Sequence, residues 1–288
     1  MPGVEGSRPQ LCYRLAVPEL PEVETVRRSL SARLVGRRVV GCRARAVRLR
    51  SCVDPASWQP LLGTTLVRVE RRGKFLLLVF GELSAVLHLG MSGRLLVVAP
   101  GAPLQPHTHL TLHFEGAELH FQDPRRFGRA EVWPTARLAE VPALAGLGPD
   151  ALAEGVEEVL LAAAARTRAP IRSVLLDQRV VAGLGNIYAT EALARAGIRP
   201  TRPAGGLAAR RLRRLALAIR SVLEEAIAAG GTTLQDGGFQ DAEGRAGFFA
   251  VELCVYGREG LPCRRCGSSV RRLALGGRSA YFCPRCQR

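Results

Sequence analysis

The pattern of apolar residues changes near residue 134 of the 288-residue chain, and this change limits the folds that the chain can adopt. Before that point, short β-type runs are separated by turn residues, and such a density of strands indicates an antiparallel sandwich or barrel. The runs are Val39–Val47, Thr65–Arg72, Phe75–Phe80, Ala85–Leu89, Leu95–Val98, Leu110–Phe114, Glu118–Phe121 and Arg129–Trp133. We therefore predict a strand-rich domain at residues 18–134.

A helical pattern follows residues 135–150, which are rich in Pro, Gly and Ala and are predicted as a linker. The predicted helices are Val156–Arg166, Ile171–Asp177, Ile187–Ala196 and Leu207–Ala229. The chain is long enough for a sizeable core and for two domains. The whole pattern favours an α+β multidomain fold, with a helical domain at residues 151–245 and a further element at 246–288.

One more helix is predicted ahead of the strands, where residues 18–25 have the sequence PELPEVET. Apolar residues recur at spacings of three and four from Leu20 to Leu34, and Pro21 suits the first turn of a helix. Glu22 and Glu24 complement the positive end of the helix dipole. This pattern alone is explained by a well-capped amphipathic helix that flanks the strand domain.

The chain carries a formal net charge of +16, which favours a polyanionic partner, either nucleic acid or an anionic membrane surface. Nucleic acid is favoured because 40 of the 41 basic residues are Arg, which binds phosphate bidentately. No apolar run reaches the roughly 18 residues of a membrane span, and residues 1–17 contain no signal-peptide h-region. The expected location is the cytoplasm, at the nucleoid.

Lys74 is the only lysine in the chain. Arginine does not lose its proton in a protein, whereas lysine can take part in proton transfer or nucleophilic chemistry. A single lysine among so many arginines therefore marks a candidate reactive site. The alternative is a lysine without a special role that is present by chance at the end of a strand.

Four of the eight cysteines form two C-x-x-C pairs that are separated by 16 residues. This spacing is typical of a structural zinc ion held by four thiolates, with disulfides as the alternative. The predicted ligands of this one zinc are Cys263, Cys266, Cys283 and Cys286. Arg271, Arg272 and Arg278 lie between the pairs, so the zinc element carries its own positive surface.

Two turns contain residue types that suit contacts with DNA. Gly183 and Gly185 precede a predicted helix, whose N-terminal N–H groups could receive a phosphate with Asn186 as a further donor. Residues 123–128, DPRRFG, place Arg125 and Arg126 beside Phe127 on a turn. A wedge of this kind can separate two stacked bases, although helix capping and an ordinary core Phe are the simpler alternatives.

Seven motifs together resemble the bacterial formamidopyrimidine-DNA glycosylase family, and the match covers residues 18–288. They are PELPEVET at 18–25, RRGKFLLL at 71–78, HLGMSG at 88–93, DPRRFG at 123–128, VAGLGNIYATEAL at 181–193, GGTTLQD at 230–236 and the closing C-x-x-C pair. The resemblance implies an N-terminal antiparallel β-sandwich with a flanking helix, a helix-two-turns-helix domain and a C-terminal zinc finger. Damaged double-stranded DNA would lie between the domains, bound by a monomer.

The family's activity is excision of 8-oxoguanine and ring-opened purines, followed by β,δ-elimination of the strand. By this resemblance, Pro18 is the N-terminal nucleophile that forms an iminium with the sugar, and Glu19 is the acid/base beside it. Lys74 matches the lysine next to the phosphate of the lesion nucleotide. Glu22 would support the start of the helix, and Glu191 would be a second acid near the site.

The resemblance also assigns the residues that hold DNA. Asn186 and Arg278 match a pair that grips backbone phosphates. Met91, Arg125 and Phe127 match three residues that fill the gap left by the extruded base, with Arg125 on the orphaned cytosine.

Two alternatives stay open. The sister branch of the family removes oxidised pyrimidines with the same fold and nucleophile, but Leu20, the set of Met91, Arg125 and Phe127, and the loop Phe239–Phe249 favour the purine branch. A zinc-finger DNA-binding protein without catalysis fits the composition equally well. Only the state of Pro18, Glu19 and Lys74 separates this non-catalytic protein from the enzyme.

Residues 1–17 precede Pro18, and with Val17 attached the Pro18 nitrogen is an amide that cannot form an iminium. A free α-amine titrates near pH 7.7 to 8, and about a tenth of it is therefore unprotonated at neutral pH. We expect the active protein to begin at Pro18, after proteolysis or after initiation at Val17 through an alternative start codon.

Overall fold

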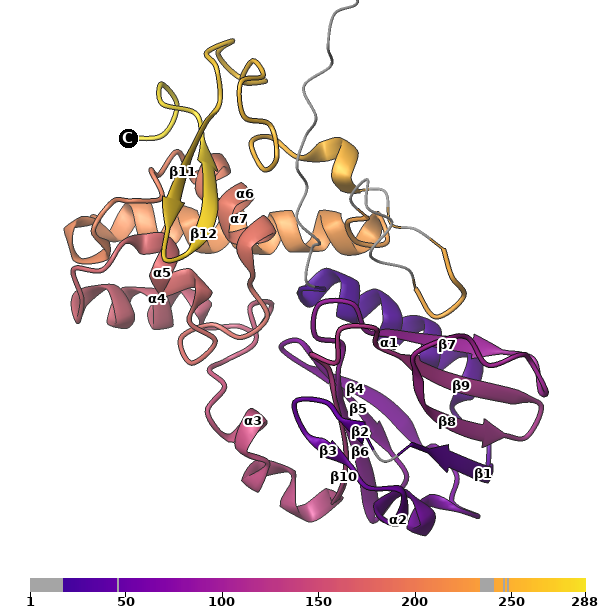
Figure 1. Cartoon of the computed structure of the whole chain (residues 1–288). Helices are drawn as coiled ribbons and strands as arrows, with labels where there is room; N and C mark the ends of the chain where they lie inside the picture. Colours follow the sequence, from indigo (N-terminus) through magenta and orange to yellow (C-terminus); the bar gives the residue numbers. More distant parts are fainter. Residues whose placement is uncertain (1–17, 46, 234–240, 246, 248) are drawn as a thin grey trace, which may run out of the picture.

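A computed structural model describes residues 18–288 except 46, 234–240, 246 and 248 (Figure 1). The N-terminal extension and parts of the GGTTLQD motif and of the loop Phe239–Phe249 lie outside the described residues. The chain forms a strand-rich body, a helical body and a C-terminal hairpin that stands on the helical body.

The strand-rich body contains two antiparallel four-stranded sheets, as predicted for a sandwich. The first sheet has the order β1 (Val39–Ala44), β8 (Thr108–Phe114), β9 (Ala117–Gln122) and β7 (Arg94–Val98). The second has the order β10 (Arg129–Pro134), β6 (Leu83–His88), β5 (Phe75–Val79) and β4 (Arg68–Arg72). The predicted run Val39–Val47 is divided, because β1 ends at Ala44 and Val47 begins the small ribbon of β2 (Val47–Arg48) and β3 (Cys52–Val53). The short helix α2 (Pro55–Trp58) and the turn η1 (Gln59–Leu61) follow this ribbon.

Helix α1 (Leu20–Leu34) contributes to two hydrophobic cores. Val23, Val26, Leu30 and Leu34 are buried in the core of the sandwich, whereas Leu20 is buried in the core of the helical body. A fully buried aliphatic side chain contributes roughly 1.5–3 kcal/mol, so both cores hold this helix in place. The N-terminal end of α1 therefore lies where the two bodies meet.

The segment predicted as a linker contains a 3₁₀ turn, η2 (Thr135–Glu140), and a short helix, α3 (Pro142–Ala145). Val141 and Leu144 pack with Leu77 and Val86 on the sandwich. The Pro and Ala content that indicated a linker thus accompanies a segment that is bound to the first body.

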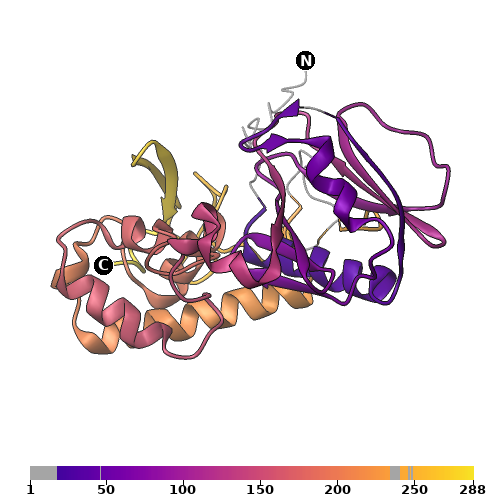
Figure 2. The ribbon, with the colours of Figure 1, turned by 90° about the horizontal axis from the view of Figure 1, so that it is seen from below.

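The helical body consists of α4 (Val156–Ala165), α5 (Ile171–Leu176), α6 (Asn186–Ala196), η3 (Ala204–Gly206) and α7 (Ala209–Ala228). The long helix α7 reaches from this body to α1 (Figures 1 and 2). After η4 (Phe249–Glu252) the chain forms a hairpin of β11 (Arg271–Leu275) and β12 (Arg278–Phe282). Among the described residues, no helix has the length and apolar character needed to cross a membrane.

Candidate active site and nucleic-acid interface

The first residues of α1 lie against the glycine turn that precedes α6. The Leu20 N–H donates to the Gly183 carbonyl oxygen at 3.1 Å, and Pro18 and Glu19 are buried beside this contact. Gly183 has φ +104, and a Cβ at this position would lie 2.6 Å from Leu20 Cδ1. Only glycine therefore allows the two segments to approach so closely.

The Glu19 side chain binds the backbone N–H groups at the N-terminus of α6. Its Oε1 accepts from the Ile187 N–H at 2.9 Å and its Oε2 from the Tyr188 N–H at 3.3 Å. A Cβ on Gly185 would lie 2.2 Å from the carboxyl carbon of Glu19. The prediction that these helix N–H groups receive a phosphate is wrong, because a carboxylate from α1 already takes them.

Lys74 lies in the turn between β4 and β5 and is half-buried. Burial lowers its pKa, the Glu19 carboxylate opposes this change, and the charge of Arg278 adds to it. Burial raises the pKa of Glu19, while Lys74 and the backbone N–H groups of α6 oppose that change. The two groups influence each other and are both moved toward neutrality, which is typical of a site for proton transfer.

Glu22 connects α1 to two other segments. Its Oε2 accepts from the Glu19 N–H at 2.8 Å, and its Oε1 accepts from the Thr232 N–H at 2.7 Å and from the Tyr188 hydroxyl. Burial raises the pKa of Glu22 to about 7, although the Tyr188 hydroxyl lowers it. Sequence reasoning missed Tyr188 and Thr232, and the one available sign was that a buried tyrosine hydroxyl needs a partner.

Asn186 and the hairpin that carries Arg278 come together on one side of the helical body. Asn186 Nδ2 donates to the Ser279 carbonyl oxygen at 3.0 Å, next to the exposed Arg278. Arg172, which sequence reasoning missed, is 1% exposed and donates to the Leu275 and Ser279 carbonyl oxygens and to Asn186 Oδ1. This buried guanidinium joins α5, α6 and the hairpin.

The turns that carry Met91 and Arg125 are joined by Asp123, which is fully buried. Its Oδ1 accepts from the Ser92 hydroxyl at 2.7 Å, and Ser92 Oγ in turn accepts from the Arg125 N–H at 3.2 Å. Met91 is half-buried, and Phe127 is 37% exposed. Sequence reasoning missed Asp123 as the residue that holds these turns together.

Arg125 and Arg126 differ in their surroundings, although both are exposed. The Arg125 guanidinium carbon lies 5.0 Å from the centroid of the Phe127 ring. Arg126 adopts a left-handed φ of 57° at the tip of the turn. An exposed aromatic ring beside a guanidinium is an arrangement that can enter a base stack.

Glu191, predicted as a second acid near the site, has its described contacts with the segment that leads into the hairpin. Its carboxylate accepts from the backbone N–H groups of Cys254, Val255 and Tyr256, at 2.8 to 3.0 Å. Glu191 thus ties α6 to the segment that leads into the hairpin, and its carboxylate is fully buried. Its role as a second acid stays a prediction.

The four paired cysteines form a metal site. Their Sγ atoms all lie within 4.8 Å of one another, with 4.0 Å between Cys263 and Cys286 and 3.4 Å between Cys266 and Cys283. Four thiolates at zinc–sulfur distances of about 2.3 Å place the sulfurs of a tetrahedron about 3.8 Å apart. The residues fit one structural zinc ion, which would hold the hairpin at the end opposite the turn that carries Arg278.

Three family models match the chain along its length. The formamidopyrimidine-DNA glycosylase N-terminal domain matches residues 17–130, the H2TH domain of the same enzymes matches 147–237, and a zinc finger found in FPG and IleRS matches 260–288.

Relatives and solved structures agree with these matches. The formamidopyrimidine-DNA glycosylase of Methylococcus capsulatus is 47% identical over 94% of this chain and all of that protein. The crystal structure of the Thermus thermophilus MutM (Fpg) protein, 42% identical, has a TM-score of 0.84 and matches over 94% of this chain and 98% of that one. A structure of MutM with DNA containing carbocyclic 8-oxo-G has a TM-score of 0.85 at 33% identity, over 94% of this chain and all of that one. This chain belongs to the formamidopyrimidine-DNA glycosylase family and is a zinc-containing DNA glycosylase of base excision repair.

Proposed function

We propose that this protein excises oxidised purines, such as 8-oxoguanine and formamidopyrimidines, from double-stranded DNA and then cleaves the strand. The observation that carries the proposal is the meeting of Pro18, Glu19 and Lys74 where the two bodies adjoin. A buried carboxyl with a raised pKa and a lysine with a lowered pKa suit proton transfer and phosphate contact near a neutral nucleophile.

In the proposed reaction, the Pro18 nitrogen forms a bond to C1′ of the damaged nucleotide while the bond to the base breaks. The C1′–O4′ bond of the sugar ring then breaks, with a proton going to O4′, and the nitrogen lone pair forms an iminium with C1′. The iminium makes C2′ acidic, so that loss of a C2′ proton expels the 3′ phosphate, and a second elimination with loss of a further proton expels the 5′ phosphate. Glu19 in its protonated form donates a proton near the sugar ring, and Lys74 binds the phosphate of the same nucleotide.

The chemistry requires a free amine at Pro18. With Val17 attached, the Pro18 nitrogen is a tertiary amide without a usable lone pair. We infer that the active form begins at Pro18, and the family model, whose match begins at residue 17, supports this inference. Proteolysis and initiation at Val17 would both produce that form.

The remaining predicted residues would hold the DNA. Arg278 and Asn186 lie together and would bind backbone phosphates, which requires Asn186 Nδ2 to release the Ser279 carbonyl oxygen. Met91, Arg125 and Phe127 would enter the space left by the flipped base, and Arg126 would contact the backbone beside them. We expect one monomer at each lesion, in the cytoplasm at the nucleoid.

The test is a gel assay on a duplex that contains 8-oxoguanine opposite cytosine, with a protein that begins at Pro18. We expect strand cleavage and, in the presence of borohydride, a covalent protein–DNA adduct. The chain that keeps residues 1–17 is the matched control and should form no adduct. A duplex with an oxidised pyrimidine should be cleaved more slowly; the reverse preference would move the protein to the sister branch. Binding without cleavage would favour the non-catalytic alternative.

A further inference from the structure

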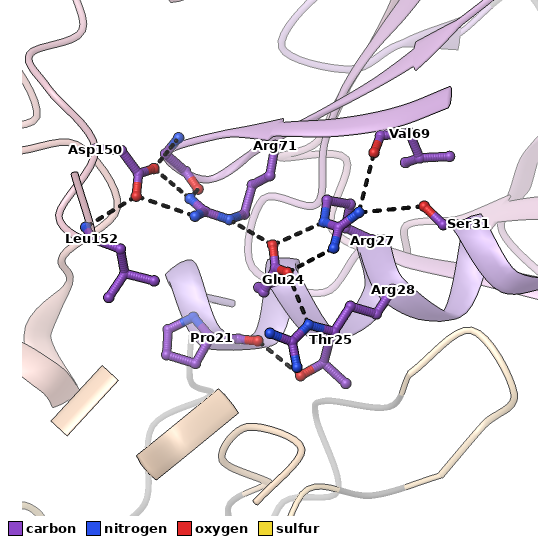
Figure 3. Close-up of polar contacts among 11 residues, drawn as sticks. Pro21, Glu24, Thr25, Arg27, Arg28, Ser31, Val69, Arg71, Asp150 and Leu152 are labelled. Carbon is purple, nitrogen blue, oxygen red and sulfur yellow. Dashed lines mark hydrogen bonds and ion pairs between the residues drawn. The ribbon is translucent and has the colours of Figure 1, made fainter. Parts of the chain in front are cut away.

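A second group of charged residues surrounds Glu24 of α1, and within it an ion pair joins the two bodies (Figure 3). Asp150 stands at the start of the helical body and Arg71 on β4. Both guanidinium Nη atoms of Arg71 donate to the Asp150 carboxylate, the Nη2 contact being 3.1 Å. The side chains are 10% and 24% exposed, so water weakens this pair only in part.

Arg71 has three partners on three parts of the chain. Besides Asp150, its Nε donates to Glu24 of α1 at 3.1 Å and its Nη1 donates to the Gly73 carbonyl oxygen at 3.0 Å. Glu24 is in turn held by Arg27 and Arg28. Because most of the guanidinium N–H groups are already bound, Arg71 is not available as a contact for DNA phosphate.

Asp150 also binds the backbone of the turn that carries Lys74. Its Oδ2 accepts from the Gly73 N–H at 3.1 Å, so both backbone polar groups of Gly73 are fixed, one by Asp150 and one by Arg71. Gly73 has φ +57, and a Cβ there would lie 3.1 Å from the Cβ of Ala182. The backbone directly before Lys74 is thus fitted against the helical body.

The same part of the helical body holds the glycine turn at Glu19. Asp150 and Ala182 form a parallel bridge, in which the Ala151 N–H donates to Ala182 and the Ala182 N–H donates to Pro149. Ala182 directly precedes Gly183, the partner of Leu20. Asp150 is therefore placed to set the position of Lys74 relative to the segment that holds Glu19.

We propose that Asp150 is a positioning residue for Lys74, and that it acts through Arg71 and the backbone of Gly73. The inference rests on the proposed function in one respect, namely that Lys74 binds the phosphate of the damaged nucleotide. Neither Asp150 nor Arg71 touches the reacting atoms in this proposal; their task is to hold the β4–β5 turn against the helical body.

The first test is a double-mutant cycle on the rate of 8-oxoguanine excision in single turnovers. Asp150→Asn should lower this rate about 10- to 100-fold with little change in DNA affinity, because small displacements of an active-site group have effects of this size. In a Lys74→Ala background the same substitution should cost little, since the residue that it positions is gone. A purely structural role would instead lower both rates by the same factor.

The matched control is Glu157→Gln, which removes the carboxylate of an exposed ion pair with Arg213 inside the helical body. It should leave the rate unchanged. Arg71→Lys is the second variant, because lysine keeps the charge but cannot reach Glu24, Gly73 and Asp150 together. It should behave like Asp150→Asn, and wild-type rates in both variants would overturn the proposal.

The second test does not depend on activity. Lys74 is the only lysine of the wild type, so an amine-specific reagent labels one side chain there and in Asp150→Asn, and two in Arg71→Lys. Fragmentation of the labelled peptide in mass spectrometry separates the two lysines and measures the rate at Lys74. Labelling of Lys74 should be several-fold faster in Asp150→Asn and Arg71→Lys than in the wild type and Glu157→Gln. Unchanged labelling would refute the inference. Faster labelling in the two variants, together with a wild type that excises nothing, would refute the proposed function and leave the positioning role intact.

Discussion

Helix α1 and its N-cap residue Glu19 place carboxylates in two regions, and the carboxylate pKa is raised in one region and lowered in the other. Glu19 and Glu22 are buried at the junction with α6 and are bound mainly by backbone N–H groups and a tyrosine hydroxyl. Burial raises both pKa values. Glu24 lies two residues later among arginines, and although burial alone would raise its pKa, the hydrogen bonds from Arg27 and Arg28 lower it on balance.

The difference shows that the hydrogen-bond donors around a carboxylate decide whether it can take up a proton or stays ionised. Neutral donors leave a buried carboxyl able to take up a proton near neutral pH, which suits proton transfer. Guanidinium partners keep the carboxylate ionised over the whole physiological range, which suits a permanent link between segments. We therefore expect catalysis from the region of Glu19 and Glu22, and positioning from the region of Glu24.

The largest expected effect is on activity. Glu19→Gln removes the proton that Glu19 would donate, and the rate of excision should fall by about 10²- to 10⁴-fold, the usual contribution of a general acid. Single-turnover kinetics on the 8-oxoguanine duplex measure this rate. Glu24→Gln is the comparison from the other region and should lose far less activity, because Arg71 keeps Asp150 and Gly73 as partners; equal losses in both variants would remove the distinction between the two regions.

Glu24→Gln should instead reduce stability. It leaves Arg27 without a carboxylate and takes from Arg71 one of its two carboxylate partners, in a largely buried position, and breaking such a pair costs about 3 kcal/mol in the free energy of unfolding. Urea denaturation at pH 7 measures the loss. The exposed pair of Arg137 and Glu140 provides the control, since Glu140→Gln should leave the free energy of unfolding nearly unchanged.

Glu22 should make stability depend on pH with the opposite sign to Glu24. Its pKa of about 7 in the folded protein exceeds the usual 4.5, so its contribution is complete below pH 4.5 and is lost as the pH rises through 7. Between pH 5.5 and 8.5 the wild type should lose about 2 kcal/mol more than Glu22→Gln. Urea denaturation at both pH values measures this difference, and parallel pH profiles would contradict the assigned pKa.

Local patterns in the sequence predicted the features whose residues are close in the chain. The zinc ligands follow from two C-x-x-C pairs, and the position of Glu22 follows from its place three residues after Glu19, where it completes a capping box. The α+β architecture and the family were also predicted correctly, because strand alternation and seven motifs are visible without any knowledge of tertiary contacts.

The contacts that were missed join residues far apart in the chain. Tyr188 is 166 residues from Glu22, Thr232 is 210 residues from it, and Asp150 is 79 residues from Arg71. The N-terminus of α6 is instructive, because the sequence correctly indicated an anion there and incorrectly indicated a phosphate. The true anion, Glu19, is 168 residues from Ile187. Helix dipoles select a charge, and only the tertiary fold selects which residue supplies it.

The smallest expected effect concerns the tyrosine that helps to keep Glu22 ionised. The Tyr188 hydroxyl lies between Glu22 and Thr232, and it lowers the pKa of Glu22. Tyr188→Phe should therefore raise the pKa of Glu22 and destabilise the protein by about 1 kcal/mol at pH 5.5. The loss should be larger at pH 8.5, because the carboxylate is then charged and hydrogen bonds to charged groups contribute more.

Urea denaturation of Tyr188→Phe at the two pH values tests this expectation. Tyr281→Phe is the matched control, since Tyr281 packs against Tyr256 in the hairpin region, with ring centroids 5.1 Å apart, and has no contact with α1 among those described. Its loss of stability should not change with pH. If the penalty of Tyr188→Phe were also constant, Tyr188 would serve packing alone, because a hydroxyl that stabilises the ionised carboxylate must matter more at the pH where that carboxylate is ionised.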